Sequence, residues 1–291
     1  MKVAVTACSG RLGRAIIAHL CEQIGAENVI GVARTPDSIE AAGIEKRAGD
    51  YLSSASMTEA LAGADAVIMI SAPVKPGTDR VAMHRNVIAA AKAAGVRKIL
   101  YTSIIGNGDE AGTFFAASQK INRQTEADIE ASGLDWVIGR NGLYIELDLG
   151  HIVRANESGV YSNNGADGRC GYLTIDEMAY AFARMAIDDA HNGKIYNVIG
   201  DLVTQAELVA QANEVFGLHV EYLPISDDEN VERFMADPDI SARGREVAEM
   251  LTGCFQCIRK GAFAVTSDFE AATGRPPKSI RRMMEEVRDA A

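Results

Sequence analysis

The first thirteen residues constrain the fold more than any other part of the sequence. The apolar run of residues 3–5 breaks at Ala7 into a turn of small residues, and a helical pattern starts at Gly13. A strand, a turn and a helix in direct succession aim backbone N–H groups and the positive end of the helix dipole at one point. The segment therefore predicts a site for the pyrophosphate of a dinucleotide. The residues expected to bind it are Thr6, Ser9, Gly10, Arg11, Leu12 and Gly13.

Ala7 departs from the usual form of this turn, in which its position is a glycine. A Cβ at the tightest point of the turn crowds an approaching phosphate, because only glycine leaves that space free. A glycine pattern alone is also a weak signal for dinucleotide binding. The interpretation therefore depends on other segments of the chain.

Length and charge narrow the class of protein. The 291 residues suffice for one large core or for a nucleotide-binding domain with a smaller lobe. The net charge of -11 disfavours DNA or RNA as a partner, because nucleic-acid binding needs a basic face. The sequence shows no signal peptide and no apolar run of membrane-spanning length, so we expect a cytoplasmic protein without a membrane partner.

The five cysteines do not follow the pattern of a disulfide framework. Cys254 and Cys257 have the spacing of half a metal or redox site. They lack a second ligand pair and lie inside an apolar helical pattern, so two buried or half-buried thiols are the simpler interpretation. No metal is expected.

Apolar runs alternate with helical patterns through the first half of the chain, which is typical of βαβ units around a parallel sheet. The predicted fold class is α/β, a doubly wound Rossmann sheet with a smaller C-terminal α/β lobe for the substrate. Residues 1–150 are expected to bind the dinucleotide and 151–291 to form an interleaved lobe, with a segment near 170–200 returning to the sheet. The predicted strands are 2–6, 29–33, 45–48, 66–70, 98–102, 136–140 and 195–199, and the predicted helices are 13–23, 38–42, 57–62, 80–94, 118–132, 175–187, 204–216, 227–258 and 279–287.

Arg34, at the end of the second predicted strand, indicates which dinucleotide binds. An acid at this position accepts the ribose hydroxyls of NAD, whereas a basic residue pairs with the 2′-phosphate of NADP. No acid is adjacent to Arg34, so NADP(H) is favoured over NAD(H). Arg11 in the turn could clamp the same phosphate, and the alternative is that Arg34 is a solvated loop charge.

Two more strand ends point into the same crevice. Asp50 could accept a hydrogen bond from the adenine amino group, and the small Ser71 and Ala72 let backbone approach the dinucleotide closely. Turn chemistry explains these residues equally well, because Asp and Ser side chains bond to nearby backbone N–H groups.

These segments together resemble the NmrA-like atypical short-chain dehydrogenases, within them the branch of NADPH quinone oxidoreductase 2 and triphenylmethane reductase. The likeness extends from Met1 to about Ile199 and is carried by residues 6–13, Arg34, 84–96, 101–103, 132–134 and 140–144. The resemblance implies an NAD(P)H-dependent oxidoreductase without flavin or metal. Its expected reaction is hydride transfer from NADPH to a quinone or a similar electron-poor conjugated or aromatic acceptor.

The chain departs from this family at the expected catalytic helix. Relatives carry His or Lys four residues before a Glu, where this chain has Asn122 before Glu126. Lys120 lies two residues earlier, about 200° around a helix, so it cannot replace the missing base without irregular backbone. No tyrosine is followed by a lysine four residues later, which disfavours alcohol and ketone chemistry that needs such a pair.

Reduction of a quinone gives a delocalised, weakly basic anion, so positioning can supply most of the catalysis. We expect Thr102 and Asn141 to bind the cofactor beside the nicotinamide. Ser103 is expected to act in catalysis together with Asn122 or Lys120, which would orient the acceptor oxygen. Gly142 and Tyr144 are expected to line the substrate wall, with a packed loop aromatic as the alternative for Tyr144. His84 is expected to be a surface or capping residue at the start of its helix.

Two other functions stay open at this point. Members of the family that bind dinucleotide without turnover report redox state to a protein partner, and the missing His or Lys at Asn122 favours that interpretation. Reduction of a plant-derived aromatic or ether, as in isoflavone and lignan reductases, ranks lower because those enzymes use a Lys there. A homodimer is compatible with the sequence, which fixes neither the oligomeric state nor the acceptor.

Overall fold

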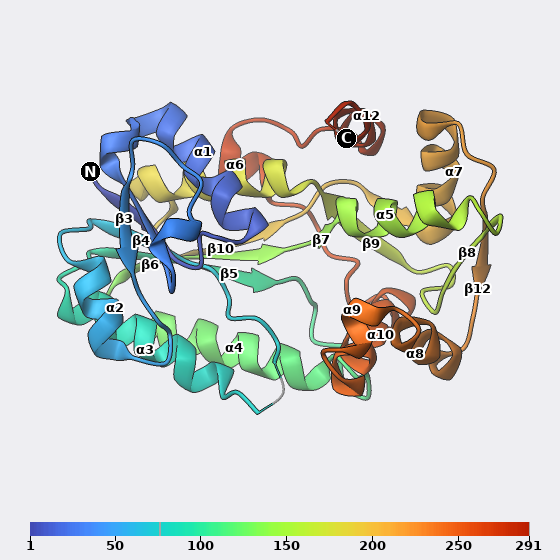
Figure 1. The fold of residues 1–291 in the computed structure, drawn as a ribbon, viewed down its shortest axis with the longest axis horizontal. Coiled ribbons are helices and arrows are strands. Elements are labelled where there is room, and N and C mark those ends of the chain that lie inside the picture. Colours follow the sequence, from blue (N-terminus) through green and yellow to red (C-terminus); the bar gives the residue numbers. More distant parts are fainter. Residues whose placement is uncertain (76, 291) are drawn as a thin grey trace.

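The computed structural model describes residues 1–75 and 77–290 and is built around a parallel sheet of seven strands (Figure 1). The spatial order is β10-β6-β5-β4-β1-β2-β3, and every neighbouring pair is parallel. This confirms the predicted doubly wound sheet, with all seven strands at the predicted places. Their bounds are β1 Val3–Val5, β2 Val29–Ala33, β3 Glu45–Ala48, β4 Ala66–Met69, β5 Lys98–Ile104, β6 Asp135–Asn141 and β10 Lys194–Val198.

Helices cover both faces of the sheet (Figure 1). One face carries α1 (Arg11–Ile24) and α6 (Ile175–Ile187), which pack against each other. The other face carries α2 (Ser54–Leu61), α3 (Arg80–Ala93) and α4 (Ala116–Glu130). The inner strands are apolar on both sides and are buried, as expected for a parallel sheet between two helical layers.

The strand order shows where a ligand site is expected. β1 lies between β2 and β4, so the chain moves away from β1 in one direction for β2 and β3 and in the other from β4 onward. The loops that follow β1 and β4 therefore separate at their carboxyl ends, which is where doubly wound sheets bind ligands.

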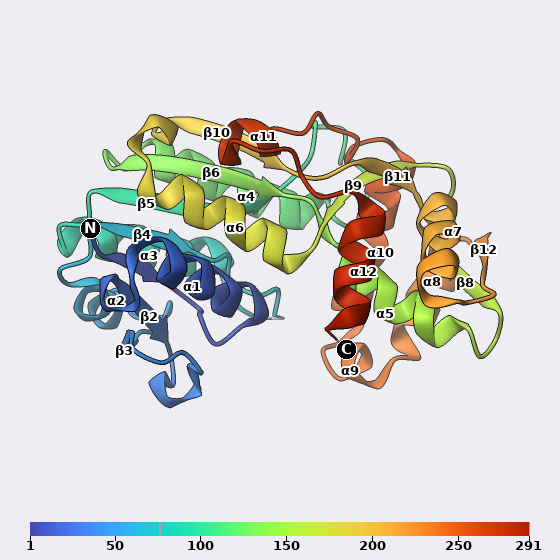
Figure 2. The same cartoon turned by 90° about the horizontal axis from the view of Figure 1, so that it is seen from above.

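A second group of elements lies beyond the carboxyl ends of the strands (Figures 1 and 2). It contains a sheet in the order β11-β9-β7 and a pair β12-β8. The bounds of these strands are β7 Leu143–Tyr144, β8 Val160–Asn163, β9 Arg169–Leu173, β11 Leu202–Thr204 and β12 Glu221–Pro224. The helices here are α5 Ile145–Ala155, α7 Gln205–Phe216, α8 Asp227–Met235, α9 Pro238–Ser241, α10 Arg245–Arg259 and α12 Ile280–Asp289.

The chain passes between the sheet and this lobe several times. After β9 it returns to supply α6 and the edge strand β10, and α11 (Phe269–Thr273) packs on the same edge. The buried Glu177 of α6 accepts two hydrogen bonds from Arg275, at 2.6 and 2.8 Å, which fixes the segment leading to α12. Short 3-10 turns complete the elements: η1 Ala26–Asn28, η2 Pro36–Ser38 and η3 Asp189–His191.

Two predicted helices are wrong in detail. Residues 38–42 form no helix, because η2 ends at Ser38 and the buried Ile39 turns into the core. The segment 227–258 is broken into three helices rather than one. Pro238 supplies no N–H and starts α9 after the cap Asp237, and Gly244, at a φ of 95°, precedes α10.

Among the described residues, no helix combines the length and the apolar composition that crossing a membrane requires.

Candidate active site

The turn after β1 has the tight geometry that the sequence predicts. Ala7 takes the left-handed conformation, at a φ of 48°, which costs an alanine about 1 kcal/mol relative to glycine. Gly10 is the N-cap of α1, and its exposed backbone opens toward solvent. A Cβ on Gly13 would lie 2.5 Å from the Cα of Cys8, so only glycine lets α1 approach the turn this closely.

Thr6 and Leu12 lie at this turn, and both are buried. The Thr6 hydroxyl hydrogen-bonds to the Tyr51 hydroxyl and also donates to the Ile68 carbonyl at 3.2 Å. Leu12, in the first turn of α1, packs into the core. Their contacts hold the turn on the sheet, whereas Ser9, Gly10 and Arg11 remain accessible to a ligand.

Two further predicted cofactor residues, Arg34 and Asp50, follow β2 and β3, and Arg11 in the turn lies close to the lobe. Arg34 is exposed immediately after β2, as a 2′-phosphate contact requires. Burial raises the pKa values of Tyr144 and Glu146, and the charge of Arg11 opposes this shift, so Arg11 lies near these lobe residues. Asp50 Oδ1 accepts from Leu52 N–H at 3.0 Å, which is the turn chemistry that was the alternative to adenine binding.

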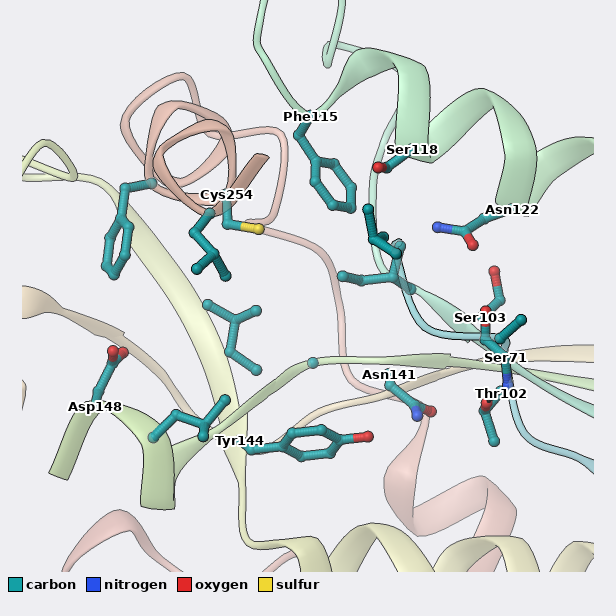
Figure 3. A pocket seen from close by; sticks show the side chains of 18 of the residues that line it. Ser71, Thr102, Ser103, Phe115, Ser118, Asn122, Asn141, Tyr144, Asp148 and Cys254 are labelled. Carbon is teal, nitrogen blue, oxygen red and sulfur yellow. Dashed lines mark hydrogen bonds between the residues drawn. The ribbon is translucent and has the colours of Figure 1, made fainter. Parts of the chain in front are cut away.

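A cavity of about 520 Å³ lies between the carboxyl ends of the strands and the lobe. Figure 3 shows polar residues of the sheet on one side and residues of α5 and α10 on the other. The structure brings residues predicted for the cofactor (Ser71, Ala72, Thr102, Asn141), for catalysis (Ser103, Asn122) and for the substrate (Gly142, Tyr144) together on its wall. Lys120 is exposed and is not among the lining residues, because it lies on the outer side of α4.

Asn122 is held by two donors from neighbouring elements. Its Oδ1 accepts from the Tyr101 hydroxyl at 3.2 Å and from Arg80 Nη2 at 3.4 Å. Its amide nitrogen donates to Gln119 Oε1 at 3.4 Å, which leaves the second N–H of the amide for a ligand in the cavity (Figure 3). Asn122 therefore offers the cavity a neutral hydrogen-bond donor.

Arg80 is a buried guanidinium on the cavity wall. Its Nε donates to the Ala72 carbonyl at 2.9 Å and its Nη2 to Ser71 Oγ at 2.8 Å. Within the described residues no carboxylate pairs with it, and burial lowers its pKa. An arginine stays protonated even so, and the site therefore holds an uncompensated positive charge.

Ser103 belongs to a buried ionic cluster. Its hydroxyl donates to Glu126 Oε1 at 2.5 Å, and Arg140 binds the same carboxylate through two hydrogen bonds at 2.7 and 3.1 Å. Arg123 also contacts Glu126, at 2.5 Å. The hydroxyl proton of Ser103 is thus committed to Glu126, and its oxygen accepts from Arg123 Nη1 at 3.4 Å, which leaves one lone pair for a ligand in the cavity.

His84 is not the surface or capping residue expected from the sequence; it is fully buried and fixes the loop after β4. Its Nε2 accepts from Ala72 N–H at 2.9 Å, and its Nδ1 lies 2.8 Å from Thr125 Oγ1. Thr125 in turn donates to the Ile121 carbonyl, so Nδ1 carries the proton and the ring is neutral. The prediction failed because α3 turns this face inward against α4.

The folded protein should lose stability as the solution becomes more acidic, because His84 resists protonation only when folded. Burial, followed by repulsion from Arg80, lowers its pKa from 6.5 to about 3. The unfolded chain binds this proton below pH 6.5 and the folded chain does not, so stability is lost as pH falls from 6.5 toward 3. Between pH 7 and 5 the wild type should lose about 2 kcal/mol of unfolding free energy through His84, measured by thermal unfolding, in addition to the loss from other histidines with lowered pKa values. A His84→Gln variant should lose this part of the pH dependence, and an unchanged dependence would contradict the assignment.

Two parts of the described structure could hold a dinucleotide: the turn at Gly13 and the cavity wall at Asn141. The cradle at Gly13 leaves no room for a Cβ, and the exposed start of α1 offers N–H groups to a pyrophosphate. At the other end, Asn141 Oδ1 is buried on the cavity wall without a hydrogen-bond partner among the described residues. A buried acceptor left unpaired is destabilising, and a nicotinamide carboxamide would supply the missing donor.

Cys254 and Cys257 lie on α10 as half-buried and buried thiols. Burial raises the pKa of Cys257 to about 11 and that of Cys254 further, so both are protonated thiols at neutral pH. Among the described residues, no group of three or more His, Cys, Asp or Glu side chains is placed to hold a metal ion.

Sequence reasoning missed Arg80, His84, Tyr101 and the lobe residue Asp148. Arg80 and His84 lie one turn apart on α3, which was a signal, because two polar residues share a face of a helix that covers a sheet. Tyr101 was noted only as part of the family resemblance. Asp148 gave no such signal, since its helix was not predicted.

The sheet, the turn and the cavity define a dinucleotide-binding protein of the Rossmann type, and comparisons place it in a family. A family model described as NAD(P)H-binding matches residues 8–159. Quinone oxidoreductase 2 of Escherichia coli is 33% identical over 229 residues, which are 77% of this chain and 78% of that protein.

Two solved structures extend the likeness over the whole chain. Escherichia coli NADPH-dependent quinone oxidoreductase complexed with NADPH has a TM-score of 0.86 and 28% identity, covering 98% of this chain and 99% of its own. Citrobacter sp. triphenylmethane reductase complexed with NADP(H) also has a TM-score of 0.86 and 28% identity, with 100% of both chains covered. The chain belongs to this NAD(P)H-binding, NmrA-like family, which confirms the resemblance found in the sequence.

Proposed function

We propose that this protein is an NADPH-dependent reductase that transfers hydride to a quinone or a similar electron-poor conjugated acceptor. The observation that carries the proposal is the pairing of Arg80 and Asn122 on the cavity wall: one supplies a positive charge without a carboxylate, the other a neutral donor. This pair suits an acceptor that becomes an anion during reduction. The bound relatives named above support NADP(H) as the cofactor.

Each part of the cofactor has residues that would hold it. Ser9, Gly10 and Gly13 would bind the pyrophosphate at the start of α1, and Arg34 the 2′-phosphate. Thr102, whose Oγ1 accepts from Ser71 N–H at 2.8 Å, fixes the strand ends beside the nicotinamide. Asn141 would accept from the carboxamide. When bound, NADPH supplies the hydride.

The acceptor would lie between Tyr144 and the Asn122 side of the cavity (Figure 3). Asn122 donates through its amide to the acceptor oxygen, and Arg80 stabilises the negative charge that grows there. Ser103 borders the same space and keeps its orientation through Glu126. The Tyr101 hydroxyl donates to Asn122, so it acts as a positioning group. No strong general acid is required, since the product anion is delocalised and takes its proton from water.

Replacing Arg34 should change the preference between cofactors. In Arg34→Ser we expect kcat/KM for NADPH to fall about tenfold to a hundredfold, because charged hydrogen bonds to the 2′-phosphate are lost. The value for NADH, which lacks that phosphate, should change little. Initial rates with both cofactors and one quinone measure this, with Arg85→Ser on the surface of α3 as the charge-matched control. Equal losses for NADPH and NADH would argue against Arg34 as the 2′-phosphate residue.

A non-catalytic NADP(H) sensor is the second candidate, and the neutral Asn122 favours it. A panel of quinones separates the two. The reductase predicts NADPH oxidation that saturates with quinone concentration. The sensor predicts NADPH binding with no oxidation above the uncatalysed rate on any acceptor.

A further inference from the structure

Asp148 is a buried carboxylate at the end of the cavity away from Asn122, Ser71 and Thr102 (Figure 3). It lies on α5, and only 7% of it is exposed. The structure shows no cation within ion-pair distance of it among the described residues, although burying an unpaired carboxylate is destabilising.

A chain of hydrogen bonds ends on Asp148. Asn163 donates to Gln205 Oε1 at 2.9 Å, Gln205 donates to the Tyr172 hydroxyl at 2.7 Å, and Tyr172 donates to Asp148 Oδ2 at 2.6 Å. Tyr161 donates to the other oxygen at 3.2 Å. A carboxylate accepts about four hydrogen bonds, so these two leave acceptor capacity toward the cavity. Asp148 is therefore an acceptor in this network, since the hydroxyls of Tyr161 and Tyr172 both donate to it.

His151 provides a donor one helical turn later on the same cavity wall. Arg154 Nη2 donates to its Nδ1 at 2.8 Å, and a guanidinium can only donate. Burial and nearby arginines lower the pKa of His151 to about 4, so the ring is neutral and carries its proton on Nε2. α5 therefore presents an acceptor and a donor side by side.

The charges around this pair favour a neutral ligand group over a cation. Arg233 on α8 lies close enough to oppose the rise that burial causes in the Asp148 pKa, although no ion pair joins these two described residues. Arg243 also lines the cavity. An ammonium group would be repelled by both guanidinium groups, whereas a hydroxyl donates to Asp148 and accepts from His151 without added charge.

Most of the wall around the pair is apolar: Leu143, Leu147, Phe234, Ile240, Leu251 and Phe255. An apolar wall with few fixed polar groups orients a ligand through those groups. We propose that Asp148 and His151 bind a hydroxyl group at the end of the acceptor remote from the ring that receives the hydride. This inference rests on the reductase function proposed above and names the class of its substrate: hydroxylated, elongated quinonoid or aromatic acceptors.

The test uses pairs of para-benzoquinones with the same ring and a side chain of two to eight carbons that ends in methyl or in hydroxyl. The side chain insulates the ring, so both members of a pair have the same redox potential. For each pair, NADPH oxidation gives KM, and calorimetry in the presence of NADP+ gives Kd without turnover. At one chain length we expect the hydroxyl member to bind about tenfold more tightly or better, as expected for a hydrogen bond to a charged acceptor.

Variants test whether Asp148 causes this preference for the hydroxyl member. In Asp148→Leu the preference should vanish while the methyl member still binds, and in Asp148→Asn, which keeps a neutral acceptor, it should fall several-fold. Glu157→Gln removes the same charge from an exposed position just after α5 and should keep the preference. Because each pair is compared within one variant, a loss of folded protein does not imitate the result.

Equal affinity for both members at every length in the wild type would overturn the Asp148 assignment, as would an unchanged preference in Asp148→Leu and Asp148→Asn. Either result leaves the reductase proposal intact if the quinones are reduced. Absence of turnover on every quinone contradicts the reductase instead, and the calorimetric preference is then still decisive for Asp148.

Discussion

Arg80→Met should lower kcat for quinone reduction by about two to three orders of magnitude, the size of effect seen when one preorganised donor to a developing anion is lost. Methionine keeps much of the buried volume but removes the charge beside Asn122. KM for NADPH should change little, since Arg80 contacts the loop after β4 and Asn122 rather than the phosphate turn. Steady-state kinetics with NADPH and a short-chain benzoquinone measure both values.

Arg80→Lys distinguishes charge from geometry. Lysine keeps the charge but cannot bond to Ala72 and Ser71 in the fork that Arg80 makes, so an intermediate loss of about tenfold is expected. Thermal unfolding of both variants shows whether the loop remains folded. Activity within a few-fold of the wild type in a folded Arg80→Met would remove Arg80 from the proposed chemistry.

Gly13→Ala should weaken NADPH binding by at least about tenfold and also destabilise the fold. The added Cβ would lie 2.5 Å from Cys8 Cα and 3.2 Å from Cys8 C, and backbone atoms cannot move aside as a side-chain end can. Overpacking of this kind destabilises by about 1–3 kcal/mol, more than the gain in helix propensity. Fluorescence titration of NADPH and thermal unfolding measure the two effects.

Gly10→Ala is the matched control at the same turn. A Cβ there meets nothing closer than 3.4 Å, an ordinary contact with the Ala7 carbonyl oxygen. Folding should therefore be nearly unchanged while NADPH affinity falls, because the side chain faces the approaching phosphate. Unchanged affinity in both variants would show that the phosphate binds elsewhere.

The sequence was sufficient for the sheet because most of its strands are short apolar runs between helical patterns, with the polar edge strand β3 as the exception. It also predicted that Thr102, Asn122, Asn141 and Tyr144 would lie close together, since strand ends and one helix face of a doubly wound sheet meet at one edge, whereas the roles assigned to them stay predictions. These positions follow from local periodicity and a general topology. The turn at Gly13 is predicted for the same reason.

The remaining parts depend on contacts that local patterns do not contain. His84 looks like a helix-start residue, and only the packing of α3 against α4 shows that it is buried. Arg80 becomes a site residue because it donates hydrogen bonds to Ser71 and Ala72 in the loop after β4. These contacts cannot be read from the pattern of its own helix. Asp148 depends on Tyr161 and Tyr172 from two later strands. Lys120 was considered because it is a lysine, but the helix turns it outward.

The most direct test of the reductase is a single turnover of bound NADPH. The protein, in excess over NADPH and without oxygen, is mixed rapidly with para-benzoquinone, and the loss of NADPH absorbance is followed. The structure predicts that bound NADPH is oxidised at least about a hundredfold faster than free NADPH, with one hydroquinone formed for each NADPH. Oxidation of bound NADPH no faster than that of free NADPH would contradict the account and identify a protein that binds the cofactor without using it.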